Sequence, residues 1–263
     1  MLNYLLPWLW VSIIGFCIIM YVILDGFTLG TGLLLPFMKE THHKDIAMSV
    51  ILPTWDGNQT WLVLGVASLY GGFPLAFSLL MPILYFPLLI MVLALLFRGV
   101  AFEFRERSQP SRRIYWEWIF SLASLAATLC QGLLLGSFVH GFNDLGPLNV
   151  HNPVPFFHWL TPFSLATAIF LVFGHALLGS TRLILKTIGP LQKQMFGLAR
   201  FCLILIVIGL VAVSLWTPHI NPKLYQFWFN PHHMLYLAIL PIVSLIVVIA
   251  LWFNLSRQND LWP

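Results

Sequence analysis

Two aspartates lie within strongly apolar stretches of this sequence, where a charged side chain is costly. Asp25 follows the run "CIIMYVIL", and Asp56 is at the centre of "LPTWDGNQTWLV" (52–63). A charge at the centre of a bilayer costs ~2.5–3.5 kcal/mol on insertion scales, so such groups usually face a bundle interior, a partner or water. We therefore take Asp25 and Asp56 as candidate proton-relay residues. The alternative is a carboxyl group that a neighbouring helix satisfies without any function.

The residues around Asp56 support a functional role for this carboxylate. Trp55 and Trp61 offer flat apolar surfaces for packing beside a cofactor ring, and the polar residues 58–60 add hydrogen-bond donors and acceptors. A polar turn inside lipid must face protein or a bound ligand, because hydrocarbon cannot satisfy it. The segment around Asp56 is thus the strongest candidate site in the sequence.

Two further charged residues, Arg98 and Glu103, lie near the end of another apolar segment. They are five residues apart, which is too far for an ideal i,i+4 ion pair. Arg98 is close enough to the membrane surface to extend its charged end toward water. We predict structural roles for both residues, with Glu103 marking the end of the helix.

Small residues recur at helical spacing in two segments. Gly26 and Gly30 follow Asp25 and lie on nearly one helix face. Gly132 and Gly136 have the same spacing further along the chain. Glycines at this spacing let membrane helices approach closely. We therefore predict helix packing, rather than chemistry, at these four positions.

Histidine usage argues against a haem held by this chain alone. A haem held between helices needs inward His or Met ligands at matching depth. Only His175 lies in the middle of an apolar segment, where a hydrogen-bonded core histidine is the more frequent role. We therefore predict no haem and no metal bound through this chain's own ligands.

Composition defines the class of protein. Hydrophobic residues make up 59% of the 263 residues and charged residues only 8%, against about 25% charged in an ordinary soluble domain. We predict an all-α, polytopic membrane protein and no nucleic-acid binding. The apolar runs predict seven membrane segments, at 5–37, 47–70, 74–102, 116–140, 160–185, 196–217 and 232–254.

Cations in the connections predict the orientation. They gather in alternate loops, whereas the segments "NDLGPLNVHNPVPFFHW" and 217–231 together contain only Lys223. Because cytoplasmic loops are enriched in Lys and Arg, we predict an N-terminus outside and a C-terminus inside. The cations concerned are Lys39, Lys44, Arg105, Arg107, Arg112, Arg113, Lys186, Lys193, Arg200 and Arg257.

A faint internal repeat predicts two related units. "GFTLGTGLLL" (26–35) resembles "HALLGSTRLI" (175–184) at an offset of 149 residues, although chance similarity of two small-residue faces is an equal alternative. We predict a four-helix unit at residues 1–150 and a second, three-helix unit at residues 151–263.

Several runs in order along the chain resemble a known family. They are "DGFTLGTGLLLPF" (25–37), "LPTWDGNQTWLV" (52–63), "GGFPLAFS" (71–78), "LYFPLLIMVLALLFRGVAFEFR" (84–105) and "LLGSTRLILKT" (177–187). Together they are similar to subunit II of the bacterial cytochrome bd-type quinol oxidases, including the cyanide-insensitive branch. The similarity covers nearly the whole chain.

The resemblance implies a function. Such a subunit belongs to an inner-membrane oxidase that couples quinol oxidation to reduction of dioxygen to water and takes its protons from the inner side. Haem b, haem d and the quinol site are expected in the partner, subunit I. The resemblance links Asp56 to a proton-entry route near those haems, with Trp55 beside it. We extend this to Trp61, and expect none of the three to be a haem ligand.

The resemblance implies further partners and shows departures. A small accessory membrane subunit and a bound lipid or quinone are expected partners. Thr28 stands where the family often has a second acid, which weakens an acid-lined path there. The family also has about two more helices. A natural short form, a truncation and a fragment are the alternatives for this chain.

A second functional class competes with the oxidase. A weak repeat, proline-interrupted helices and intramembrane acids also occur in proton-coupled secondary transporters. Against a transporter, the second repeat is incomplete. A neighbouring gene for a haem-binding subunit would favour the oxidase, and uptake by the protein alone would favour the transporter.

Overall fold

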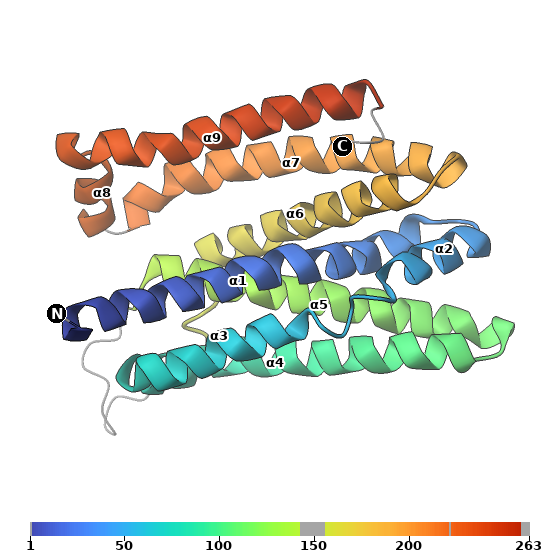
Figure 1. Ribbon diagram of the computed structural model, residues 1–263, viewed down its shortest axis with the longest axis horizontal. Coiled ribbons are helices and arrows are strands. Elements are labelled where there is room, and N and C mark those ends of the chain that lie inside the picture. The colour runs from blue at the N-terminus through green and yellow to red at the C-terminus, as the bar shows by residue number, and fades with distance from the viewer. Residues whose placement is uncertain (1, 143–155, 221, 259–263) are drawn as a thin grey trace. The chain divides into compact units, whose positions relative to one another are not determined.

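The computed structural model describes residues 2–142, 156–220 and 222–258 as helices joined by short connections (Figure 1). Within these ranges there is no β-strand. The elements are α1 (Leu2–Leu34), η1 (Leu35–Phe37), α2 (Thr41–Ile51), α3 (Gln59–Gly72), α4 (Pro74–Arg107), η2 (Pro110–Arg112), α5 (Arg113–His140), α6 (Pro162–Lys186), α7 (Pro190–Ile220), α8 (Pro222–Trp228) and α9 (Pro231–Ser256). The all-α prediction is confirmed.

Six helices in the described part of the chain are long and apolar enough to cross a membrane. They are Leu5–Phe37, Tyr85–Arg107, Pro110–His140, Pro162–Lys186, Pro190–Ile220 and Leu237–Ser256. Each corresponds to one of the segments predicted from hydropathy. The chain is therefore a multi-pass membrane protein.

Within the predicted second segment, 47–70, the helix is interrupted. The structure has two short helices there, α2 and α3, joined by turns over residues 52–58 (Figure 1). Pro53 lacks a backbone N–H, and Gly57 carries a high conformational entropy, so neither favours a helix interior. Hydropathy averaged along the segment did not reveal the break, because apolar runs flank it on both sides.

The chain divides into two compact units. The first comprises residues 1–127, in which α1 packs against α2 and α3, and α3 against α4. A tight connection joins α3 to α4: Gly72 ends one helix and Pro74 begins the next. Gly72 also lies against Trp10, since a Cβ there would come 2.7 Å from the indole ring.

The second unit comprises residues 128–263. In it α6 packs along α7, and α7 contacts α8 and α9. A capping box stabilises the start of α6, where Thr161 and Ser164 exchange side-chain and backbone hydrogen bonds. The predicted boundary between residues 150 and 151 lies outside the described residues, as does His151.

Candidate functional site

Asp25 lies in a closed, buried cluster between α1 and α4. Arg98 Nη2 donates to Asp25 Oδ1 at 2.8 Å, and the Thr28 hydroxyl donates to the same oxygen at 2.6 Å. Arg98 Nη1 in turn donates to Thr28 Oγ1 at 3.2 Å. All three residues are at most 1% exposed. The cluster therefore joins one carboxylate, one guanidinium and one hydroxyl away from solvent and lipid.

This cluster corrects the predicted position of Arg98. We expected its charged end to extend toward the membrane surface, but the side chain is 1% exposed and pairs with Asp25. The two residues are 73 positions apart, so local spacing gave no sign of the pair. In the described part of the chain, Asp25 Oδ2 and Arg98 Nε have no hydrogen-bond partner. The pair thus keeps one unused acceptor and one unused donor.

Asp56 lies in a different environment, on the turns between α2 and α3. Its side chain is exposed, and it has no ion pair or hydrogen bond within the described residues. The neighbouring Asn58 is only 4% exposed. Asp56 therefore forms no direct bond to the Asp25 cluster. Its buried neighbour Asn58 connects the two regions, because it bonds Leu24, the residue before Asp25.

Two contacts hold this turn in place. The Trp55 ring stacks at a tilt on Phe102 of α4, with centroids 5.0 Å apart, and lies so close to Gly99 that a Cβ there would come within 3.2 Å. At the other end of the turn, Asn58 Nδ2 donates to the backbone oxygen of Leu24 at 3.0 Å. Asp56 is thereby presented from a turn that is fixed on both sides.

The anchor on α1 gives the position of the turn along that helix. Leu24 is 13 residues before Phe37, where the first candidate span ends, or about 20 Å at 1.5 Å per residue. A non-helical backbone at such a depth is tolerated only where it is covered by protein or lines water. The exposed Asp56 turn, if it lies at membrane depth, must therefore be covered by protein or face water.

Trp61, the other tryptophan of this motif, lies on α3 and packs edge-on against Phe16 of α1, with ring centroids 5.6 Å apart. The same helix pair brings Gly65 close to Cys17. Within this chain Trp61 thus serves the contact between α1 and α3. Its predicted place beside a partner's haem remains a prediction.

A second charged network lies where α2, α4 and α5 meet at the cation-rich end of the first unit. Arg105 donates to Glu117 Oε1 through Nε and Nη2 at 3.1 and 2.8 Å, and Lys44 binds Glu117 Oε2 at 2.7 Å. Arg105 also reaches Asp45 at 2.7 Å. This network was not predicted from the sequence. The signal was present in the opposite charges of residues 39–45 and 103–117, which flank successive helix ends.

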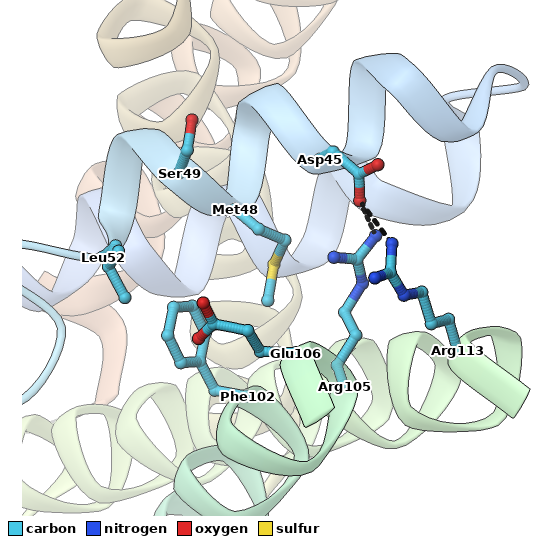
Figure 2. A pocket seen from close by; sticks show the side chains of 8 residues that line it. All are labelled: Asp45, Met48, Ser49, Leu52, Phe102, Arg105, Glu106 and Arg113. Carbon is cyan, nitrogen blue, oxygen red and sulfur yellow. Dashed lines mark hydrogen bonds and ion pairs between the residues drawn. The ribbon is translucent and has the colours of Figure 1, made fainter. Parts of the chain in front are cut away.

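A concavity of about 250 Å³ opens beside this network (Figure 2). Arg105 and Arg113 both point toward Asp45 there, while Glu106 and Phe102 line the same concavity. Glu103, by contrast, faces outward and forms a 3.4 Å pair with Arg107 on the same helix. Glu103 lies in the last turns of α4, which ends at Arg107, as expected for a residue that marks the helix end.

In the second unit, small residues lie where α5 meets α6. A Cβ on Gly132 would overlap the Ala168 backbone, and one on Gly136 would overlap that of Ser164. On α1, Gly26 and Gly30 are buried.

His175 of α6 is 1% exposed, and its Nδ1 lies 3.2 Å from Thr128 Oγ1. Among the described residues, no group of three or more His, Cys, Asp or Glu is arranged to hold a metal ion.

Comparison with known proteins bears on these features. The family model for cytochrome bd terminal oxidase subunit II matches residues 6–263. The chain belongs to this family. In this chain, residues 55–58 of the Trp-Asp-Gly-Asn-Gln run lie on the turns between α2 and α3, Gln59 begins α3, and the buried Arg98 lies on α4.

Curated relatives in the cytochrome bd family agree. The chain is 27% identical over 221 residues to cytochrome bd-I ubiquinol oxidase subunit 2 of Escherichia coli K12, which covers 82% of this chain and 58% of the relative. It is 27% identical over 211 residues to cytochrome bd ubiquinol oxidase subunit 2 of Bacillus subtilis 168, covering 78% and 61%. The chain thus matches about three fifths of the length of these relatives.

Proposed function

We propose that this chain acts as subunit II, or part of it, in a membrane-bound terminal oxidase that couples quinol oxidation to reduction of dioxygen to water. In this role it supports a haem-bearing subunit I and contributes a proton route from the inner side. Family membership supports the oxidase over the proton-coupled transporter, since the matched relatives are named as ubiquinol oxidase subunits.

The exposed Asp56 turn is the observation that carries the proposal. Its carboxylate lies on a non-helical backbone about 20 Å along α1 from the end of the first span. An ionisable group at that depth needs a protein partner or water. We propose that subunit I covers the turn, and that Asp56 takes up and passes on protons there.

Asp25 has a secondary place in this proposal. Because Arg98 and Thr28 already bind Oδ1, only Oδ2 is free to accept a proton, and protonation would weaken the pair with Arg98. Asp25 is therefore proposed first as the anion that holds Arg98 and second as a proton acceptor. Asp56 has no such partner among the described residues, and we propose that it carries the main relay role.

We assign haem b and haem d to subunit I. When bound there, they would supply the electron transfer and oxygen chemistry. The residues of this chain would act through packing and proton transfer, with Trp55 and Trp61 beside the partner's cofactor region. A small accessory subunit and a membrane lipid or quinone complete the proposed partners.

The proposed orientation follows the cations. The network of Lys44, Arg105 and Arg113 would lie at the inner face of the bacterial inner membrane, and the N-terminus would lie outside. Protons from the inner side would then approach Asp56 from the end of the first unit that carries this network.

Co-expression with the neighbouring haem-bearing subunit tests the proposal. We expect the two chains to co-purify, the reduced-minus-oxidised spectrum to show haems b and d, and the complex to consume oxygen with quinol. Replacing Asp56 by Asn should then lower quinol-dependent turnover about 100-fold or more, the low end of what a positioned proton-transfer group contributes. Failure to co-purify, together with solute uptake by this chain alone, would favour a transporter.

A further inference from the structure

The charged network at the cation-rich end of the first unit joins three helices through one carboxylate. Glu117 of α5 accepts from Arg105 of α4 through Oε1, at 3.1 and 2.8 Å, and from Lys44 of α2 through Oε2, at 2.7 Å. Arg105 also donates to Asp45, the residue after Lys44, at 2.7 Å. Glu117 therefore holds α2 and α4 to α5 at the same time.

The members of this network are largely shielded from solvent. Glu117 is 5% exposed and Arg105 is 6% exposed, and the side chain of Lys44 is 14% exposed. Exposed ion pairs contribute little to structure, but removing one member of a buried pair leaves the other charge unpaired. Loss of the Glu117 charge would leave Lys44 without its ion pair and Arg105 with Asp45 alone. These three side chains are thus coupled through Glu117.

The helix α2 has few other ties to α4 and α5. Three of its 11 side chains are buried, those of Ala47, Met48 and Ile51, and its N-cap residue Glu40 forms no side-chain capping bond. A helix of this length is marginal on its own and depends on tertiary contacts. The concavity of about 250 Å³ lies between α2 and the end of α4 (Figure 2), where apolar side chains leave space unfilled. The charged side chains bridge the two helices there.

The same helix leads directly into the Asp56 turn. Ile51, the last residue of α2, accepts backbone hydrogen bonds from Thr54 and Trp55, both at 3.1 Å. The Trp55 ring in turn stacks on Phe102 of α4. Trp55 is therefore held to α2 by its backbone and to α4 by its ring, so its position depends on the spacing of these two helices. Asp56 follows it in the chain.

We propose that Glu117 is a positioning residue for proton transfer at Asp56. Through Lys44 and Arg105 it fixes α2 relative to α4, and the backbone bonds from Ile51 extend that arrangement to the turn. Glu117 acts through these contacts and takes no part in the transfer itself. The inference rests on the proposed relay role of Asp56.

Proton uptake by Glu117→Gln tests the proposal. The complex with subunit I is reconstituted in vesicles, and a pH-sensitive dye on the inner-face side follows the protons consumed during quinol oxidation. Gln keeps the shape of Glu but places an NH₂ group against a cation. We expect uptake slower by about 10- to 100-fold, since a misplacement of about 1 Å caused far from the chemistry can cost 100-fold. The haem spectrum and the KM for quinol should match the parent.

The double variant Asp56→Asn/Glu117→Gln separates positioning from general damage to the complex. Residues that act as a unit have non-additive effects on rate, whereas independent defects multiply. The double variant should therefore take up protons no more slowly than Asp56→Asn alone. A further loss by the full factor seen for Glu117→Gln would overturn the proposal.

Hydrogen exchange reports the turn directly. The amides of Thr54 and Trp55, which bond Ile51, should exchange faster in Glu117→Gln than in the parent. Lys44→Met is a milder second variant, because it breaks the bond to α5 and leaves Glu117 bound to Arg105. It should speed this exchange and slow proton uptake to a smaller extent.

Glu40→Gln is the matched control. It makes the same chemical change at the start of α2, in a side chain that is 67% exposed and pairs with His43 at the same helix end. This pair does not join α2 to α4 or α5, so uptake and exchange should match the parent. An equal defect in Glu40→Gln would overturn the proposal, because loss of any charge at this end would then suffice.

The remaining outcomes distinguish this inference from the proposed function. If Asp56→Asn slows uptake while Glu117→Gln and Lys44→Met do not, the positioning role fails and the relay stands. If Asp56→Asn leaves uptake unchanged, the relay fails and the positioning role with it. Failure of both Glu117→Gln and Lys44→Met to assemble would show a folding role in place of positioning.

Discussion

Asp25 and Asp56 are both carboxylates in apolar parts of the sequence, yet the fold gives them opposite surroundings. Asp25 is fully buried and bonded to Arg98 and Thr28. Asp56 is exposed on a turn and has no ion pair or hydrogen bond in the described part of the chain. A charge inside one unit is neutralised by its neighbours, whereas a charge on its surface must be satisfied from outside.

The comparison separates stability from function. Removing one member of a buried ion pair leaves the other unpaired, so the Asp25 cluster should respond mainly in folding. An exposed side chain contributes little to folding, so Asp56 should respond mainly in activity. Asn58 connects the two regions, because it is buried beside Asp56 and bonded to the residue before Asp25.

The largest effect is expected from Arg98→Met. Asp25 would be left buried without its cation, which costs about 3–5 kcal/mol and should prevent accumulation of the chain in the membrane. The measurement is the amount of full-length chain, and the thermal midpoint of the complex, relative to the parent.

The double variant Asp25→Leu/Arg98→Met provides the control for that experiment. Replacing a buried pair by apolar side chains of similar volume is often nearly neutral, so the yield should recover. If Arg98→Met alone accumulates normally, the pair does not contribute to stability as described.

A smaller effect is expected from Asn58→Ala. It removes the hydrogen bond to the Leu24 oxygen and leaves a cavity at a buried position, which should lower stability by about 1–3 kcal/mol. Limited proteolysis around residues 52–58 should become faster. Gln59→Ala, at the less buried neighbouring position, is the matched control; equal proteolysis of both variants would argue against the anchor.

Thr28→Val should cost about 1 kcal/mol, because it removes a hydroxyl that bonds Asp25 and Arg98 while keeping the shape of the side chain. Thr28→Ser keeps the hydroxyl and should behave like the parent. The two thermal midpoints give the comparison, and a loss in the Ser variant as large as that in the Val variant would contradict a role for the hydrogen bonds.

The smallest effect is expected from Glu103→Gln. Its pair with Arg107 is exposed, so the change should alter stability by less than about 0.5 kcal/mol. Denaturation of the complex measures this, and a loss comparable to that of Arg98→Met would show that exposure does not separate the charged residues as argued.

Hydropathy was sufficient to predict six of the spans, since each is a long apolar run that forms one helix. It failed at residues 52–58, where Pro53 ends a helix and tertiary contacts of Trp55 and Asn58 hold a turn. Such contacts join distant segments, so averaging along the chain cannot detect them.

The candidate site was only partly predictable. The cost of a charge in lipid was enough to single out Asp25 and Asp56, but not to tell them apart. Their difference depends on Arg98, 73 residues from Asp25, and on which face of the unit each carboxylate occupies. Thr28, noted only as a departure from the family, proved to be a bonded member of the buried cluster.

Proton uptake by Asp56→Asn and Asp25→Asn complexes tests the central claim most directly. Each variant is reconstituted in vesicles with subunit I, and a pH-sensitive dye on the inner-face side reports protons consumed during quinol oxidation. The account predicts that Asp56→Asn keeps its thermal midpoint and haem spectrum but takes up protons at least about 100-fold more slowly. It predicts that Asp25→Asn chiefly loses stability. Unchanged proton uptake in a fully assembled Asp56→Asn complex would contradict it.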